Sequence, residues 1–400
     1  MKNFLCTPDA MKRRTILWAI LALLGFLGGS LGKHYLIQRE QADAPVAEVA
    51  TTPPAELSTD SFSVRYFQHT LTEKVTGNIL VAPHMVSDML LAVQEHAAGK
   101  TREELQALLL QPTEHIRATE PNGAMLLAMD FNLPRNDGSR GVMPLPFSEY
   151  VPMALSLFNG SLASATGNSN AQLASSQMVT NRTKLLLGGS LHLHKDWELP
   201  FNTGNARTAG FDNASGSMPN IHLMRNRGLY RTAAAEDGNW KAVAIPFKND
   251  RTSGCSLVYI GILPAGSARD FAAQLTPELL TNIRRALAES TPQDTLVEQP
   301  RQELQILPYD MRDTLRRMGL KALFDPETAD FSPITSEKIQ LSAALFSASV
   351  YLGESSAAPQ ADSALEYAGQ VISFTRPYIW LIADLETNTP IEFLGLVEEL

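Results

Sequence analysis

Cysteine is almost absent from this chain of 400 residues, which contains only Cys6 and Cys255. Cys6 precedes an apolar segment near the N-terminus, and a membrane at that segment would separate the two thiols. We therefore expect no disulfide within the chain and no metal site built from a cysteine cluster. Cys255 lies beside Leu257 and Val258, which favours a buried core thiol.

An excess of positive charge is also lacking, because 33 Lys and Arg residues oppose 42 Asp and Glu residues and give a formal net charge of −9. Binding to phosphates requires a basic surface, so we expect no nucleic acid as a partner. His192 and His194 alternate along an apolar run and could ligate a metal, but the pattern offers no third or fourth ligand. We interpret both as structural and expect no metal and no cofactor.

Charge is missing altogether from residues 15–32, which follow Lys12, Arg13 and Arg14. About 20 apolar residues are needed to span a bilayer, and this run comes near that length. Basic residues on the N-terminal side predict that this end stays in the cytoplasm and that the rest of the chain is translocated. We therefore expect a signal anchor within residues 1–37.

Cleavage near Gly28-Gly29-Ser30 is the alternative, and it would release the chain as a secreted protein. An uncleaved anchor would leave the folded part in the periplasm or outside the cell, held at the membrane. Residues 38–56 are rich in Ala, Pro, Thr and Glu and have no apolar periodicity, which is typical of a flexible linker. Residues 57–400 then form the folded domain.

Apolar periodicity in this domain predicts helices first and then strands mixed with helices, which is typical of the α+β class. We expect helices at residues 62–71, at 86–96, from 101 onward, at 277–288 after a cap at Thr276, and at 309–318 before Gly319, and strands at 78–81, 185–194, 241–247, 257–263, 340–352, 378–382 and 391–397. The last two runs flank a polar turn and predict a hairpin. Residues 112–180 have little pattern.

Several short segments follow one another in an order that carries more information than any one of them. They are Gly77-Asn78-Ile79-Leu80-Val81-Ala82-Pro83, Gly99-Lys100-Thr101-Arg102-Glu103-Glu104-Leu105, His194-Lys195-Asp196-Trp197-Glu198-Leu199-Pro200-Phe201, Ala244-Ile245-Pro246-Phe247, Tyr309-Asp310-Met311, Phe324-Asp325-Pro326, Ala329-Asp330-Phe331-Ser332, Arg376-Pro377-Tyr378 and Phe393-Leu394-Gly395. In order and spacing, these segments resemble the serpin family of serine protease inhibitors.

The resemblance implies a large central β-sheet with additional sheets, an N-terminal helical region and an exposed reactive-centre loop. It implies an inhibitor rather than an enzyme, with a serine (or cysteine) protease as partner and a monomeric state. We expect a divergent member from a bacterium. Within residues 112–180, where serpins have a longer stretch, we expect helices to be shortened or lost.

Serpins act through a loop that is cut by the protease and then enters the central sheet as a new strand. The resemblance places the hinge of this loop at Glu354, Ser355, Ser356, Ala357, Ala358, Pro359, Gln360, Ala361 and Asp362. Small residues suit a hinge that must become a buried strand. Pro359 departs from the pattern because it has no N–H to donate and is largely excluded from central strands.

Counting from both ends of the loop places the cleaved bond within a short candidate set. The candidates are Leu365, Glu366, Tyr367, Ala368, Gly369 and Gln370. No Lys or Arg lies between Glu354 and Thr375, which argues against a trypsin-like target. Leu365 or Tyr367 would suit a chymotrypsin- or elastase-like protease.

In serpins a polar cluster lies beneath the centre of the sheet, and the positions aligned with it here are Ala82, Met85, Gly189 and Phe346. None carries a polar side chain, and the replacement of every partner indicates a repacked centre rather than a damaged one. Trp197, at the end of the sheet that opens first, is retained. Two interpretations remain, a working inhibitor and a serpin fold that binds or scaffolds without loop insertion.

A membrane-anchored hydrolase is the competing class. Gly28-Gly29-Ser30-Leu31-Gly32 matches a nucleophile motif but falls inside the apolar segment, where its strand and helix cannot form. An enzyme would need an exposed Ser near one of the histidines, and we expect none beside His69, His84, His96 or His222. Asn181-Arg182-Thr183 and Asn213-Ala214-Ser215 fit glycosylation sequons, which matter only in a eukaryotic secretory pathway.

Overall fold

The computed structural model describes residues 60–74, 76–109, 123–167, 172–213, 216–248, 256–355, 360, 365, 369–386 and 389–400. The expected anchor and linker in residues 1–56 lie outside the described residues, as do Cys6 and Cys255. Among the helices of the described part, none combines the length and the apolar character that a membrane crossing requires.

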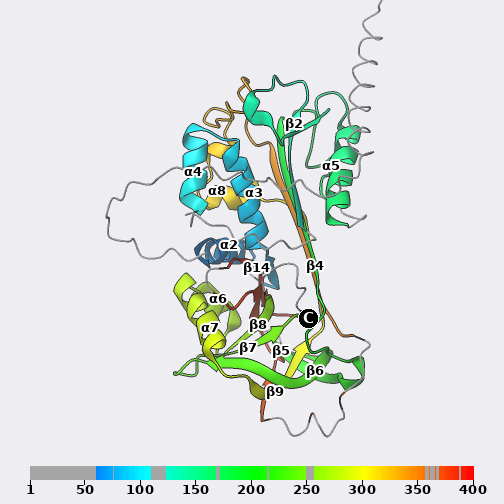
Figure 1. Ribbon diagram of the computed structural model, residues 1–400, viewed down its shortest axis with the longest axis vertical. Coiled ribbons are helices and arrows are strands. Elements are labelled where there is room, and N and C mark those ends of the chain that lie inside the picture. Colours follow the sequence, from blue (N-terminus) through cyan, green and yellow to red (C-terminus); the bar gives the residue numbers. More distant parts are fainter. Residues whose placement is uncertain are drawn as a thin grey trace, which may run out of the picture. The chain divides into compact units, whose positions relative to one another are not determined.

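The described chain begins with helices that flank one short strand (Figure 1). They are α2 (Asp60–Glu73), β1 (Ile79–Val81), α3 (Pro83–Glu95) and α4 (Gly99–Leu109). Pro83 begins α3, where its missing N–H costs nothing because the first N–H groups of a helix have no intrahelical partner. The apolar faces of α2 and α3 pack on strands, so this helical region covers one side of the core.

The strands of the described chain form two sheets. A nine-stranded sheet has the order β1-β14-β13-β8-β7-β6-β9-β12, with β5 pairing to β6. Its strands beyond β1 are β5 (Arg207–Asn213), β6 (Gly216–Ala234), β7 (Trp240–Pro246), β8 (Val258–Pro264), β9 (Gln293–Pro300), β12 (Gln370–Ser373), β13 (Tyr378–Ala383) and β14 (Ile391–Val397). Its most buried strands, β13 and β14, form the predicted hairpin.

A five-stranded sheet has the order β10-β11-β4-β2-β3. Its strands are β10 (Gln302–Asp310), β11 (Ala343–Leu352), β4 (Leu185–His194), β2 (Gly123–Asp130) and β3 (Met143–Leu145). Helix α5 (Val151–Thr166) packs on β2 and β4 from one face, and α3 packs on the same strands from the other (Figure 1). The sheet is therefore a middle layer between helices, and both its faces are buried near its centre.

Residues 112–180 hold more regular structure than their pattern suggested. The described part of this stretch contains β2, β3, a 3₁₀ turn at Asp137–Ser139 and the 16-residue helix α5. Gly167 ends α5 in the left-handed conformation, with φ of 67°, which glycine adopts without steric cost. Residues 112–122 lie outside the described residues.

The helix predicted at residues 309–318 is shorter than expected. Helix α8 covers only Arg312–Arg317, because Tyr309 and Asp310 pair with Phe346 and Leu345 as the end of β10. The sequence reading also missed strands β5, β6, β9, β10 and β12. In contrast, α7 (Pro277–Glu289) begins as predicted, since the side chain of Thr276 accepts a hydrogen bond from the N–H of Leu279.

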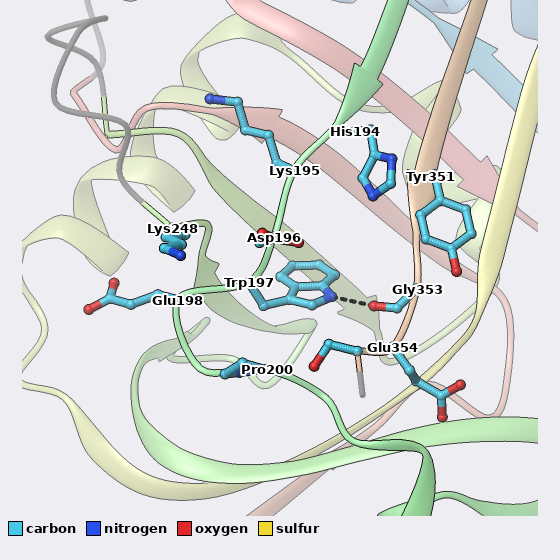
Figure 2. A pocket seen from close by; sticks show the side chains of 11 residues that line it. His194, Lys195, Asp196, Trp197, Glu198, Pro200, Lys248, Tyr351, Gly353 and Glu354 are labelled. Atoms are coloured by element: carbon cyan, nitrogen blue, oxygen red, sulfur yellow. Dashed lines mark hydrogen bonds between the residues drawn. The ribbon is translucent and has the colours of Figure 1, made fainter. Parts of the chain in front are cut away.

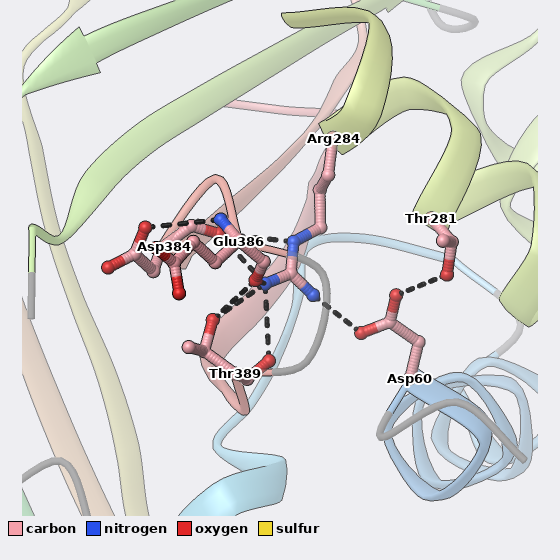
Figure 3. Close-up of polar contacts among 6 residues, drawn as sticks. All are labelled: Asp60, Thr281, Arg284, Asp384, Glu386 and Thr389. Atoms are coloured by element: carbon pink, nitrogen blue, oxygen red, sulfur yellow. Dashed lines mark hydrogen bonds and ion pairs between the residues drawn. The ribbon is translucent and has the colours of Figure 1, made fainter. Parts of the chain in front are cut away.

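A buried arginine joins the start of the domain to its C-terminal hairpin. Arg284 of α7 is fully buried, and its guanidinium donates to a carboxylate oxygen of Asp60 at 2.8 Å (Figure 3). The same guanidinium donates to the carbonyl oxygens of Asp384, Glu386 and Thr389. Burial lowers the pKa of Arg284, and the nearby carboxylates oppose that shift. The pair therefore fixes α2 against both α7 and the hairpin turn.

Asp60→Asn should lower the free energy of unfolding by about 3 kcal/mol, because it leaves a buried guanidinium without its carboxylate. Arg285→Met is the matched control on the same helix, since Arg285 is exposed and should change stability by less than about 0.5 kcal/mol. Denaturant unfolding of both variants measures the difference. Equal stability of D60N and the unmodified protein would contradict this role of the pair.

Candidate functional site

The candidate site is the central seam, the contact along which β11 and β4 pair directly. The two strands run parallel, from Ala343 opposite Leu186 to Tyr351 opposite His194. Each is antiparallel to its other neighbour, β10 or β2. A chain that turned back after β11 would be antiparallel to both strands, so it could pair with both at once if they moved apart. The geometry thus provides one place where the sheet can accept a strand.

On the α3 side, the seam is packed entirely by apolar groups. Gly189 and Phe346 face each other across the seam, and Phe346 is fully buried. A Cβ atom at Gly189 would overlap the Sδ atom of Met89, which shows how closely α3 lies against β4 at this point. Ala82 caps the start of α3 and is fully buried, and Met85 packs against the same core. Gly189 and Phe346 therefore meet across the seam in apolar surroundings, and the role of all four positions in sheet opening stays a prediction.

The α5 side of the seam carries polar pairs that the sequence reading missed. Ser347 donates to Ser190 at 3.1 Å, and Ser349 contacts Nδ1 of His192. The rings of His194 and Tyr351 lie 5.1 Å apart, with the guanidinium of Arg301 over Tyr351. These side chains alternate along both strands, which is the pattern that could have revealed them. We call the three cross-strand pairs the polar ladder.

The seam ends at Trp197, which is 4% exposed and stacks on Phe247 with ring centroids 4.7 Å apart. Its Nε1–H donates to the carbonyl oxygen of Gly353 at 2.8 Å, so the indole joins the segment after β4 to the segment after β11 (Figure 2). A cavity of about 250 Å³ lies here, lined by Trp197, His194, Tyr351 and the first hinge residues. The pairing of β4 with β11 therefore ends beside this cavity, where the hinge begins.

The hinge residues that the structure describes are held outside the seam. The N–H of Ser355 donates to the carbonyl oxygen of Phe201 at 2.8 Å, and Glu354 contacts Nε2 of His222 at 2.8 Å. Gln360 bonds to the main chain of Arg227 on β6. Residues 356–359, including Pro359, and residues 361–362 lie outside the described residues.

The candidates for the cleaved bond differ in their surroundings. Leu365 is only 1% exposed, and Gln370 begins β12, where it pairs with Thr295 of β9. A buried side chain or a residue paired in a strand is poorly presented to a protease cleft. The N–H of Gly369 donates to Asp294 at 3.3 Å. Residues 366–368 lie outside the described residues, so which of the six candidates is cleaved stays a prediction.

Arginine side chains of β5 and β6 bind carboxylates of β9, the strand that pairs with β12 at the end of the loop. Arg207 and Arg225 both bond to the buried carboxylate of Glu298, which connects β5, β6 and β9. Burial raises the pKa of Glu298, but the hydrogen bond from Arg207 and the two positive charges leave that pKa lowered overall. The hydrogen bond from Arg227 lowers the pKa of Asp294. These carboxylates therefore stay ionised and fix the strands beneath the loop.

Histidines of the described part have partners that differ from those of a hydrolase. His84 contacts the buried carboxylate of Glu392 at 2.8 Å, and His96 contacts the carbonyl oxygen of Gly138 at 2.9 Å. Ser349 contacts the ring of His192, which lies directly opposite it on the sheet rather than in a cleft. Ser87 donates to the main-chain carbonyl oxygen of His84 at 2.7 Å and not to its ring. Among the described residues, no group of three or more His, Cys, Asp or Glu residues could hold a metal ion.

A family model described as serpin (serine protease inhibitor) matches residues 139–400. This chain belongs to the serpin family. Plasminogen activator inhibitor 1 of Bos taurus is 23% identical over 385 residues, which cover 86% of this chain and 92% of that protein. Antithrombin-III of Homo sapiens is 25% identical over 266 residues, covering 64% of this chain and 55% of that protein.

Solved serpin structures share the fold. Uncleaved ovalbumin superposes with a TM-score of 0.74 at 18% identity, covering 86% of this chain and 98% of the ovalbumin chain. Serpin-12 of Manduca sexta gives a TM-score of 0.72 at 19% identity, covering 86% and 98%. The α+β serpin fold is therefore confirmed. The family description names protease inhibitors, and the expectation that this chain is not an enzyme stays a prediction. These relatives are animal proteins, and a bacterial origin stays a prediction.

Gly189→Ala should destabilise this serpin by about 1–3 kcal/mol, because the added methyl group overlaps Met89 in a close-packed seam. Met89→Ala in the same chain should relieve the overlap, so the double variant should lose less stability than the two single losses together. Gly160→Ala is the control, since a Cβ at this exposed position of α5 meets no atom within 4 Å. Denaturant unfolding measures all four variants, and additive losses would contradict the packing described.

Proposed function

We propose that this serpin inhibits a serine protease of chymotrypsin- or elastase-like specificity by loop cleavage and loop insertion. The serine oxygen of the protease would attack the carbonyl carbon of the cleaved bond. The C–N bond then breaks, the amine leaves with a proton, and the N-terminal part of the loop stays attached to the protease as an ester. Insertion before water hydrolyses this ester would trap the enzyme.

The observation that carries this proposal is the closed parallel seam, which ends in a cavity where the hinge begins. The hinge leaves β11 at the end of its pairing with β4, so insertion can start there and proceed along the seam. A strand that enters would pair with β4 and β11 along their length. The described hinge residues are held outside the seam by a few hydrogen bonds, which are together weaker than a new ladder of main-chain hydrogen bonds.

A second candidate function is binding or scaffolding without insertion, and Pro359 is the observation that favours it. Proline cannot donate a hydrogen bond to a neighbouring strand, and it sits in the middle of the segment that must become one. In this case a protease would cut the loop and leave with no lasting complex. The two candidates therefore differ in the fate of the ester rather than in the fold.

The unmodified protein should form a covalent complex with chymotrypsin or with elastase that survives denaturing electrophoresis. Pro359→Ala restores one N–H to the hinge, so it should raise the ratio of complex to cleaved serpin about fivefold or more. Pro377→Ala is the matched control, because Pro377 lies on the C-terminal side of the cleaved bond and stays outside the inserted segment. Cleaved serpin without any complex, in all three proteins, would exclude inhibition of these proteases.

We also propose that the domain acts outside the membrane as a monomer tethered through residues 1–37. The charge-free run at residues 15–32 and the basic residues before it support the tether. The full chain should remain with the membrane fraction through a high-salt wash, whereas residues 57–400 should not. Recovery of the full chain in the soluble fraction would contradict an uncleaved anchor and favour a secreted form.

A further inference from the structure

One edge of β6 has no strand partner in the described structure over part of its length. β9 pairs with β6 along one edge, from Leu223 to Tyr230. On the opposite edge, β5 pairs only as far as Leu223. β7 pairs with β6 only from Arg231 onward. Arg227 lies within the interval between them, where no described strand pairs with this edge of β6.

The side chain of Gln360 takes the place of a strand at this position. Its Oε1 accepts a hydrogen bond from the N–H of Arg227 at 3.0 Å, and its Nε2 donates to the carbonyl oxygen of Arg227 at 2.8 Å. A primary amide offers a donor and an acceptor in one plane, so it reproduces the pairing of a neighbouring peptide group. The guanidinium of Arg227 binds Asp294 instead, so the contact to Gln360 uses the main chain.

Gln360 belongs to the hinge, residues 354–362, which has to enter the central seam after cleavage. It can enter only after both hydrogen bonds to Arg227 have broken. The contacts of Glu354 and Ser355 hold the hinge next to β11, and Gln360 holds it further along the chain. Insertion that begins beside β11 therefore reaches a second point of attachment at Gln360.

We propose that Gln360 is a positioning residue that clamps the hinge to the edge of β6 and so sets the rate of loop insertion. This inference rests on the proposed function, because it concerns the step that traps the protease. A faster step would trap more protease before the ester is hydrolysed, and a slower one would trap less. The clamp also keeps the loop outside the sheet in the intact protein.

Gln370 provides a matched comparison on the other side of the cleaved bond. Its Nε2 donates to Thr232, Gln293 and Thr295, so it also fastens the loop to strands of the nine-stranded sheet. After cleavage within residues 366–369, Gln370 remains with β12 and Gln360 leaves with the inserting half. A restraint at Gln370 therefore cannot slow insertion once the loop is cut.

Two substitutions remove the clamp in different ways. Gln360→Met keeps the length of the side chain but has no amide donor or acceptor. Gln360→Glu keeps an acceptor for the N–H of Arg227 but directs a charged oxygen at its carbonyl oxygen. A protonated carboxyl group has one donor and one acceptor, so the clamp of Q360E should return below the ordinary glutamate pKa of about 4.3.

The test cuts the loop with a protease specific for residues 366–369 and follows insertion over time. The readout is the fraction of cut molecules that stay folded through a short heat step above the unfolding temperature of the intact protein. At pH 7, Q360M and Q360E should insert about tenfold faster than the unmodified protein, as expected for the loss of two hydrogen bonds. Gln370→Ala should insert at the unmodified rate.

Lowering the pH to about 4 should slow Q360E toward the unmodified protein at that pH and leave Q360M fast. Unfolding temperatures of the uncut variants should match that of the unmodified protein, which separates a kinetic clamp from a general loss of stability. Equal insertion rates for the unmodified protein and Q360M would overturn the clamp and leave the proposed function intact. Absence of any gain in heat resistance after cutting, in every variant, would overturn both.

Discussion

The parallel pairing of β4 with β11 is the constraint on which the rest of this serpin depends. Both strands are antiparallel to their outer neighbours, so a strand that enters between them would be antiparallel to β4 and to β11 at once. The chain that leaves β11 is the segment nearest to that place. The hinge starts where the pairing of β4 with β11 ends, at Trp197 and the cavity beside it. The proposed insertion of the loop would therefore begin at this end of the seam.

The two faces of the seam are held by different interactions. Apolar packing of Met89 against Gly189 fills the α3 face, and the polar ladder crosses the α5 face. Opening the seam would separate each ladder pair but would expose no buried polar cluster on the α3 face. The replacement of that cluster by apolar groups therefore leaves no polar side chain without a hydrogen-bond partner at the four aligned positions. The polar contacts between β4 and β11 lie on the opposite face of the sheet.

Sequence patterns predicted those helices and strands that are specified by residues close together in the sequence. The apolar run of β4, the Thr276 cap and the hairpin of β13 with β14 were all confirmed. Tyr309 and Asp310 were assigned to a helix because their partners, Phe346 and Leu345, are distant in sequence. The clamp of Gln360 was invisible for the same reason, since it binds the main chain of Arg227 and not a recognisable side chain. Motif order identified the family, although motifs could not show that Leu365 is buried.

Hydrogen–deuterium exchange along the seam tests the central claim most directly. The account predicts that cutting the loop within residues 366–369 slows amide exchange in residues 354–362 to the level of β4 and β11, because the hinge becomes a strand paired on both sides. The amides of β4 and β11 should stay protected as well, because each strand would pair with the inserted strand in place of the other. Unchanged or faster exchange in residues 354–362 after cutting would contradict insertion into the seam.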